Sequence, residues 1–197
     1  MAQELTDKVL VQRAQAGEQA AFELLVRKYQ HKILRLISRF VRDPDDALDL
    51  TQETFIKAYR ALDTFRGDSA FYTWLYRIAI NTAKNQLSSN GRYGYIWSLN
   101  SSPGFESEEP MPEPEALRDH ATPENAVLTD ELEAVIRKAI AALPEDLRTA
   151  LTLRELEGLS YEEIAQVMGC PIGTVRSRIF RAREAVDKRL KPLIDNK

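Results

Sequence analysis

The chain has 197 residues, of which 44% are hydrophobic and 29% charged, and its net charge is −3. That length suits one or two domains of about 100 residues each. One cysteine and two histidines exclude a disulfide framework and a zinc finger built from Cys and His. No stretch approaches the ~20 apolar residues of a membrane span and the N-terminus lacks a secretory pattern, so we expect a cytoplasmic chain without membrane insertion.

Charge is distributed unevenly along the chain. Residues 1–92 carry a net charge of +3, residues 93–126 carry −6, and residues 127–197 are neutral. The acidity is confined to the middle, so both flanks can still hold local basic faces. Because phosphate neutralisation supplies most non-specific affinity for DNA, we expect the isolated chain to bind DNA weakly.

The first flank has the periodicity of an all-helical domain. Apolar residues from Phe22 to Phe40 recur every three or four positions, with Gly17 before them and Asp43-Pro44 after them. A second helix is predicted to begin near Asp45, and a third to run from about residue 70 to residue 87. The stripe that the second helix is predicted to bury consists of Leu48, Phe55, Tyr59 and Leu62.

Seven of the sixteen aromatic residues lie between Phe55 and Tyr76, interleaved with Lys and Arg. Aromatic surfaces beside cations suit unpaired nucleic-acid bases, each stacked base contributing ~1–3 kcal/mol. The turn at residues 65–69 is a place where a flipped base could enter. Core packing is the alternative, and it fits Phe55, Tyr59, Phe71 and Leu75 better. Tyr72, Trp74 and Tyr76 alternate, so we expect that one helix face cannot bury all three.

The middle of the chain has the composition of a flexible, acidic linker. Residues 88–123 are rich in Gly, Pro and Ser, and the alternation Pro110-Met111-Pro112-Glu113-Pro114 forbids a helix. Structureless segments of this length are rare inside compact domains, so this one is predicted to separate two all-helical domains. The expected divisions are residues 1–90, 91–122 and 123–197.

The second flank contains a predicted helix-turn-helix. Ser160 and Glu163 form a capping box that starts a short helix, and Gly169 suits the left-handed position that ends it. The inner face of this helix is expected to contain Ile164, Ala165 and Met168. The following helix is predicted to bury Val175, Ile179, Ala182 and Val186. It leaves outside Arg176, Ser177, Phe180, Arg181 and Arg183, and such side chains can pair with guanine edges, phosphates and thymine methyl groups.

Three segments together resemble a known family. Residues 49–62 and 65–85 are similar to regions 2.2 to 2.4 of bacterial sigma factors, and residues 143–183 are similar to region 4. The resemblance covers nearly all of the chain except the linker. It is closest to the extracytoplasmic-function group of the sigma-E and AlgU type.

The resemblance implies a transcription initiation factor of two helical domains, which needs no cofactor or metal and is not an enzyme. It would read the −35 and −10 elements of stress-response promoters and melt the −10 DNA. Its partners would be promoter DNA, the β′ clamp helices and β flap of core RNA polymerase, and a membrane-anchored anti-sigma factor.

The resemblance also implies which residues form each binding surface. The implied −35 residues are Arg154, Arg176, Ser177, Phe180 and Arg181. The implied −10 residues are Lys57, Phe65, Tyr72, Trp74, Arg77, Asn81, Lys84 and Asn85. Core polymerase would bind a face that includes Asp49, Gln52 and Glu53.

An autonomous DNA-binding regulator and an enzyme are the two alternatives to a sigma factor. An autonomous helix-turn-helix regulator would need a dimer interface and enough basic surface to bind DNA unaided. An enzyme is disfavoured, because the sequence offers only two His, no metal-ligand cluster and no Gly-rich phosphate loop.

Overall fold

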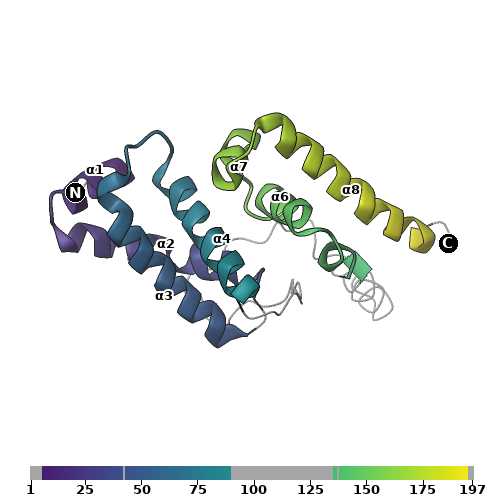
Figure 1. Ribbon diagram of the computed structural model, residues 1–197, viewed down its shortest axis with the longest axis horizontal. Coiled ribbons are helices and arrows are strands. Elements are labelled where there is room, and N and C mark those ends of the chain that lie inside the picture. The colour runs from purple at the N-terminus through teal and green to yellow at the C-terminus, as the bar shows by residue number, and fades with distance from the viewer. Residues whose placement is uncertain (1–5, 42, 90–134, 137, 195–197) are drawn as a thin grey trace, which may run out of the picture.

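A computed structural model describes residues 6–41, 43–89, 135–136 and 138–194, and every regular element within those ranges is helical (Figure 1). The all-α prediction is confirmed. The predicted linker, residues 91–122, lies outside the described residues. The elements are α1 (Asp7–Gln15), α2 (Gln19–Ile37), α3 (Pro44–Ala61), the 3-10 helix η1 (Leu62–Thr64), α4 (Phe71–Ser89), α6 (Glu145–Glu155), α7 (Tyr161–Met168) and α8 (Ile172–Ile194).

Helices α1 to α4 form a bundle that we call the first unit (Figure 1). Helix α2 lies at its centre and packs against α1, α3 and α4. Its apolar stripe is buried as predicted, with Leu25, Ile33 and Ile37 wholly inaccessible to solvent. Helix α1 was not predicted, and it buries Leu10 and Val11 against this core.

The face that α3 buries differs from the predicted one. Leu48 and Tyr59 are 39% and 52% exposed, so their assignment to the core was wrong. The buried face of α3 consists instead of Ala47, Leu50, Thr51, Thr54, Phe55 and Ala58. The two threonines can be buried because each hydroxyl donates to the carbonyl four residues earlier, at 2.8 and 2.7 Å.

Helices α6, α7 and α8 form the second unit and include the predicted helix-turn-helix (Figure 1). The capping box is present, and Gly169 ends α7 in the left-handed conformation with φ of 62°. Val175, Ile179 and Ala182 of α8 are buried as predicted, whereas Val186, also predicted to be buried, is only partly buried. The inner face of α7 was predicted only in part: it consists of Ile164 and Val167, whereas Ala165 and Met168 are only partly buried.

The capping box gives a local test of how α7 begins. Ser160 N–H donates to Glu163 Oε2 at 2.8 Å, and Glu163 N–H donates to Ser160 Oγ at 3.2 Å. We expect Glu163→Ala to lower the free energy of unfolding by about 1 kcal/mol, measured by urea denaturation. Glu162→Ala removes a carboxylate from the same turn without touching the box and is the control. Equal urea midpoints for the two variants would show that the box adds no stability.

Candidate nucleic-acid interface

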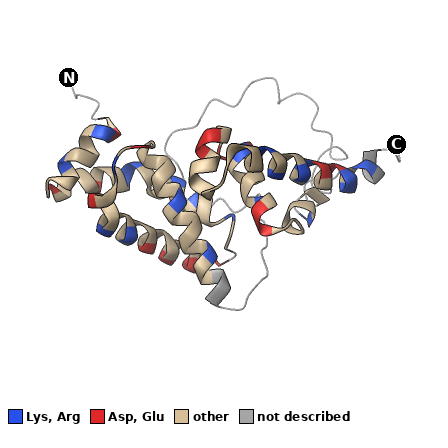
Figure 2. Ribbon diagram, turned by 45° about the horizontal axis from the view of Figure 1, so that its top comes forward, with Lys and Arg blue, Asp and Glu red and all other residues tan. Residues whose placement is uncertain are grey.

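Helix α8 exposes the side chains that the sequence placed outside its buried stripe. Arg176, Ser177 and Arg181 are exposed, and the ring of Phe180 is 68% accessible although it is large and apolar. Lys and Arg are distributed along this helix (Figure 2). A rigid helix that presents arginines and an aromatic ring has the chemistry to contact base edges in a major groove.

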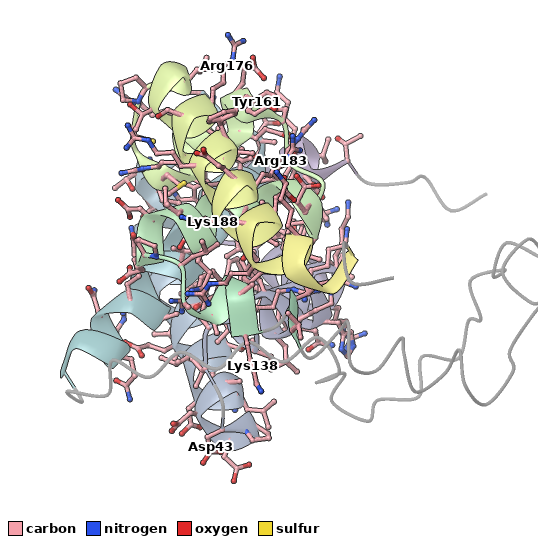
Figure 3. The ribbon with its side chains drawn as sticks, turned by 90° about the vertical axis from the view of Figure 1, so that its right-hand side faces the viewer. Asp43, Lys138, Tyr161, Arg176, Arg183 and Lys188 are labelled. Carbon is pink, nitrogen blue, oxygen red and sulfur yellow. The ribbon has the colours of Figure 1, made fainter. Side chains whose placement is uncertain are left out.

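An aromatic ring supports two of the candidate arginines. The guanidinium carbons of Arg154 and Arg176 lie 4.8 and 5.8 Å from the centroid of the Tyr161 ring, and Figure 3 shows Tyr161 near Arg176. Arg154 also donates to the carbonyl of Leu159 at 2.8 Å. Tyr161, which sequence reasoning did not select, therefore orients these cations by cation–π contact.

Two further arginines of α8 are paired within the second unit. Arg183 donates to Glu155 at 3.1 and 2.5 Å, and this hydrogen bonding raises the pKa of Arg183. Arg178 donates to Asp146 at 2.5 Å and to the sulfur of Cys170 at 3.3 Å. These contacts join α8 to the start and end of α6.

The first unit gathers four polar candidates on one face of α4. Arg77, Asn81, Lys84 and Asn85 follow the spacing of neighbouring helical turns, and all except the half-buried Lys84 are exposed. Lys57 comes close to this helix from α3, with its Nζ 3.3 Å from Thr82 Oγ1. Lys57 also pairs with Glu53 at 2.7 Å, so a candidate −10 residue contacts a candidate polymerase residue.

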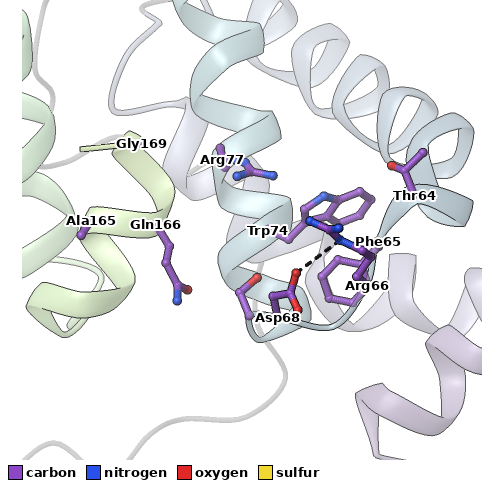
Figure 4. A pocket seen from close by; sticks show the side chains of 10 residues that line it. Thr64, Phe65, Arg66, Asp68, Trp74, Arg77, Ala165, Gln166 and Gly169 are labelled. Carbon is purple, nitrogen blue, oxygen red and sulfur yellow. Dashed lines mark ion pairs between the residues drawn. The ribbon is translucent and has the colours of Figure 1, made fainter. Parts of the chain in front are cut away.

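Phe65 and Trp74 belong to an aromatic cluster at the start of α4. Their ring centroids are 5.0 Å apart, and those of Phe71 and Trp74 are 5.7 Å apart. Trp74 is only 7% exposed, so its indole belongs to the core. Both residues also line a pocket of about 430 Å³ beside the loop at residues 65–69 (Figure 4).

Tyr72 lies away from the other −10 candidates. It lines a separate pocket with Tyr29, Lys32 and Tyr76, and its ring meets that of Tyr76 edge to face at 6.1 Å. Tyr76 is buried, and this burial together with nearby Glu157 raises the pKa of its phenol. The prediction that one helix face cannot bury all three rings is confirmed, because Trp74 and Tyr76 are buried whereas Tyr72 is only partly buried.

An exposed stripe of mixed chemistry runs along α3. Leu48, Ile56 and Tyr59 are exposed apolar residues at helical spacing, and Asp49 and Gln52 lie among them. Glu53 is half-buried and turned toward Lys57. Contiguous exposed apolar residues beside polar ones are typical of a protein-binding surface.

The described residues include no helix that is long and apolar enough to cross a membrane. They also contain no group of three or more His, Cys, Asp or Glu side chains that could hold a metal ion.

Comparison with protein families gives two matches. A model described as Sigma-70 region 2 matches residues 25–93, and a model described as Sigma-70, region 4 matches residues 133–186. The first contains α3 and α4, and the second contains the helix-turn-helix.

Individual relatives match over nearly the full length. The RNA polymerase sigma-H factor of Pseudomonas aeruginosa is 63% identical over 188 residues, which are 95% of each chain. The ECF RNA polymerase sigma-E factor of Escherichia coli K12 is 57% identical over 196 residues, 98% of this chain and 99% of the relative. Among solved structures, the sigma factor RpoE from Bartonella quintana, in complex with the anti-sigma factor NepR, is 28% identical with a TM-score of 0.59. The match between the two covers 86% of this chain and 96% of the RpoE chain.

Proposed function

Because the chain belongs to the sigma-70 family, as an RNA polymerase sigma factor of the extracytoplasmic-function group, we propose that it reads promoters with two separate surfaces, one on each unit. The observation that carries this proposal is the exposure of an arginine-bearing recognition helix on one unit and of a polar α4 face beside an aromatic pocket on the other. Residues 1–90 would form the −10 domain, residues 91–122 the linker and residues 123–197 the −35 domain.

The exposed face of α8 would read the −35 element as duplex DNA. Arg176 and Arg181 have the planar donor fork that matches the O6 and N7 atoms of guanine, and Phe180 can contact a thymine methyl group. Ser177 hydrogen-bonds locally, its Oγ donating to the Thr174 carbonyl at 2.9 Å, and can still accept from a base or donate to a phosphate after rotation. Arg154, which is held by Leu159 and Tyr161, would contact the DNA backbone or a base from the side of α6.

The polar face of α4 and the adjoining pocket would capture the −10 element as a single strand. Arg77 and Lys84 supply positive charge, and Asn81 and Asn85 supply donors and acceptors that match base edges. The pocket beside Phe65 and Trp74 offers aromatic walls to a base that has left the duplex. Melting would follow because these contacts are available only to unpaired bases. Tyr72, which lies in a different pocket, would act indirectly through Tyr76.

The exposed stripe of α3 would bind the β′ clamp helices of core polymerase. We expect Ile56→Ser to weaken association with core polymerase about tenfold, since Ile56 is 51% exposed at the centre of the stripe and apolar anchors dominate binding energy. The measurement is titration of labelled chain with core enzyme. Val9→Ser removes a similarly exposed apolar side chain from α1 and is the control. Equal affinities for the two variants would place the polymerase contact elsewhere.

Two further properties rest on the relatives. The structure of the RpoE relative is a complex with an anti-sigma factor, and we propose that an anti-sigma factor also binds this chain. The membrane anchor of that partner, the contact with the β flap and a cytoplasmic location rest on the family resemblance.

Transcription in vitro tests the proposed function against an autonomous regulator. The chain with core polymerase is expected to initiate on a promoter that carries both elements, whereas neither component alone initiates there. In a gel shift, the free chain is expected to leave duplex promoter DNA unbound until core polymerase is added. Tight duplex binding by the free chain, without any association with core polymerase, would instead favour the autonomous regulator.

A further inference from the structure

The end of α1 contacts the start of the loop at residues 65–69 through one side chain. Gln15 is the last residue of α1, and its Nε2 donates to the carbonyl oxygens of Leu62 and Phe65, both at 2.9 Å. A side-chain amide carries two N–H donors, so both hydrogen bonds can form at once. Gln15 is half-buried, and 47 and 50 residues separate it in the sequence from the two acceptors. A single side chain of α1 therefore fixes the backbone where η1 passes into the loop.

This loop forms a wall of the pocket that we assign to an unpaired base. Phe65, Arg66, Asp68 and Ser69 line the pocket together with Trp74 of α4 (Figure 4). Arg66 and Asp68 pair at 3.4 Å, but their side chains are 84% and 80% exposed. Ion pairs this exposed add little stability. The position of the loop therefore depends mainly on the contacts made at its two ends.

Phe65 is held from two sides. Its ring centroid lies 5.0 Å from that of Trp74 and 6.0 Å from that of Phe71, whereas its carbonyl is held by Gln15. The Phe65 carbonyl and the N–H of Arg66 belong to one planar, trans peptide group. A carbonyl directed at α1 therefore turns the Arg66 N–H away from α1, and this sets the direction in which the exposed part of the loop departs.

We propose that Gln15 is a positioning residue for capture of the −10 strand: its two hydrogen bonds hold the loop at residues 65–69 in the shape that admits an unpaired base. The proposal rests on the proposed function, which assigns this pocket to the −10 strand. Gln15 does not line the pocket, so it acts through the loop and not by touching the base. A loop released from α1 visits other shapes, and the apparent affinity for the strand falls with the fraction of chains whose loop keeps the capturing shape.

Gln15→Met tests this role, because methionine has nearly the length and volume of glutamine and cannot donate to the two carbonyls. The probe is a fluorescein-labelled fork-junction DNA with an unpaired −10 non-template strand, bound by the chain in complex with core polymerase. Further probes replace each base of that strand in turn by an abasic site, and the largest loss of wild-type affinity identifies the captured base. We expect Gln15→Met to bind the intact probe about fivefold more weakly than wild type, the factor that corresponds to one net hydrogen bond. The abasic site at the captured position should then cost Gln15→Met less affinity than it costs wild type.

The abasic probes separate positioning from general stability. Thr51→Val removes a hydrogen bond of 2.8 Å within α3 of the same unit, keeps the size of the side chain, and is the control. A general loss of stability lowers the affinity for all probes equally, whereas a displaced loop reduces only the contribution of the captured base. Circular dichroism melting verifies that each variant is folded. An abasic penalty as large in Gln15→Met as in wild type and Thr51→Val would overturn the positioning role.

A second variant distinguishes donation from space filling. Gln15→Glu has the shape of glutamine, but at neutral pH its carboxylate can only accept hydrogen bonds and would face two carbonyl oxygens. We therefore expect it to reduce the abasic penalty further than Gln15→Met does. A wild-type penalty in Gln15→Glu would show that the side chain only fills space, and would overturn the proposal. Failure of the proposed function would appear differently, as a wild-type chain whose affinity is unaffected by an abasic site anywhere in the −10 strand.

Discussion

Arg176→Ala and Arg181→Ala are each expected to reduce use of a −35-dependent promoter by about 5- to 150-fold, equivalent to ~1–3 kcal/mol. Both side chains are exposed on α8, whereas Val175, Ile179 and Ala182 on the opposite face are buried. Replacement by alanine therefore removes a base or phosphate contact and leaves the packing of the second unit unchanged. The measurement is the rate of transcription initiation with core polymerase at a subsaturating concentration of the chain.

A matched charge control separates base reading from general attraction to DNA. Lys188 is exposed on the same helix, closer to its C-terminal end (Figure 3), and Lys188→Ala also removes one positive charge. Because the N-terminal part of a recognition helix contacts base edges, this control is expected to have a small effect. A second template with a scrambled −35 element completes the test. An equal loss on both templates would mean that Arg176 and Arg181 bind phosphates without reading sequence.

The helix-turn-helix could be predicted because its signals are local. Ser160 and Glu163 satisfy each other's backbone groups, and Gly169 adopts a conformation that other residues rarely tolerate. Neither feature depends on the rest of the fold. The second unit therefore follows its sequence closely, with the exposed arginines of α8 where the periodicity placed them.

The buried face of α3 could not be predicted from hydrophobicity alone. The large apolar residues Leu48 and Tyr59 suggested a core stripe, but α3 packs through Leu50 and Phe55 together with two alanines and two threonines, whose hydroxyls bond to their own helix. Because α3 packs through this other face, Leu48, Ile56 and Tyr59 remain on the surface beside Asp49 and Gln52. The error therefore has a functional consequence, since the misassigned residues strengthen the case for a polymerase-binding surface.

Contacts between distant segments account for the remaining differences. Glu157 lies just after α6 in an ordinary Leu-Glu-Gly sequence, where a solvated carboxylate would be expected, yet its side chain is buried against Tyr76 and Arg39. In the sequence, 81 residues separate Glu157 from Tyr76. Local spacing carries no signal for such a pair, and the same holds for the ion pair of Lys84 with Glu145.

Trp74→Ala is expected to have the largest effect on stability, lowering the free energy of unfolding by about 3–5 kcal/mol. The indole is nearly buried and contacts the rings of Phe65 and Phe71, so alanine would leave a cavity where the loop meets α4. Urea denaturation followed by circular dichroism measures this loss. Trp74→Phe keeps an aromatic ring in the cluster and is expected to cost less.

The same pair of variants decides how Trp74 serves the −10 element. If the main role of Trp74 is to hold Phe65 and the loop at residues 65–69 in place, open-complex formation by Trp74→Ala should fall in proportion to its lost stability. Trp74→Phe should then retain most of the stability and most of the open-complex formation. If the indole instead stacks on a captured base, Trp74→Phe should be stable yet open promoters poorly. Wild-type stability of Trp74→Ala would contradict the packing role, because a buried ring in contact with two others cannot be removed from a core without cost.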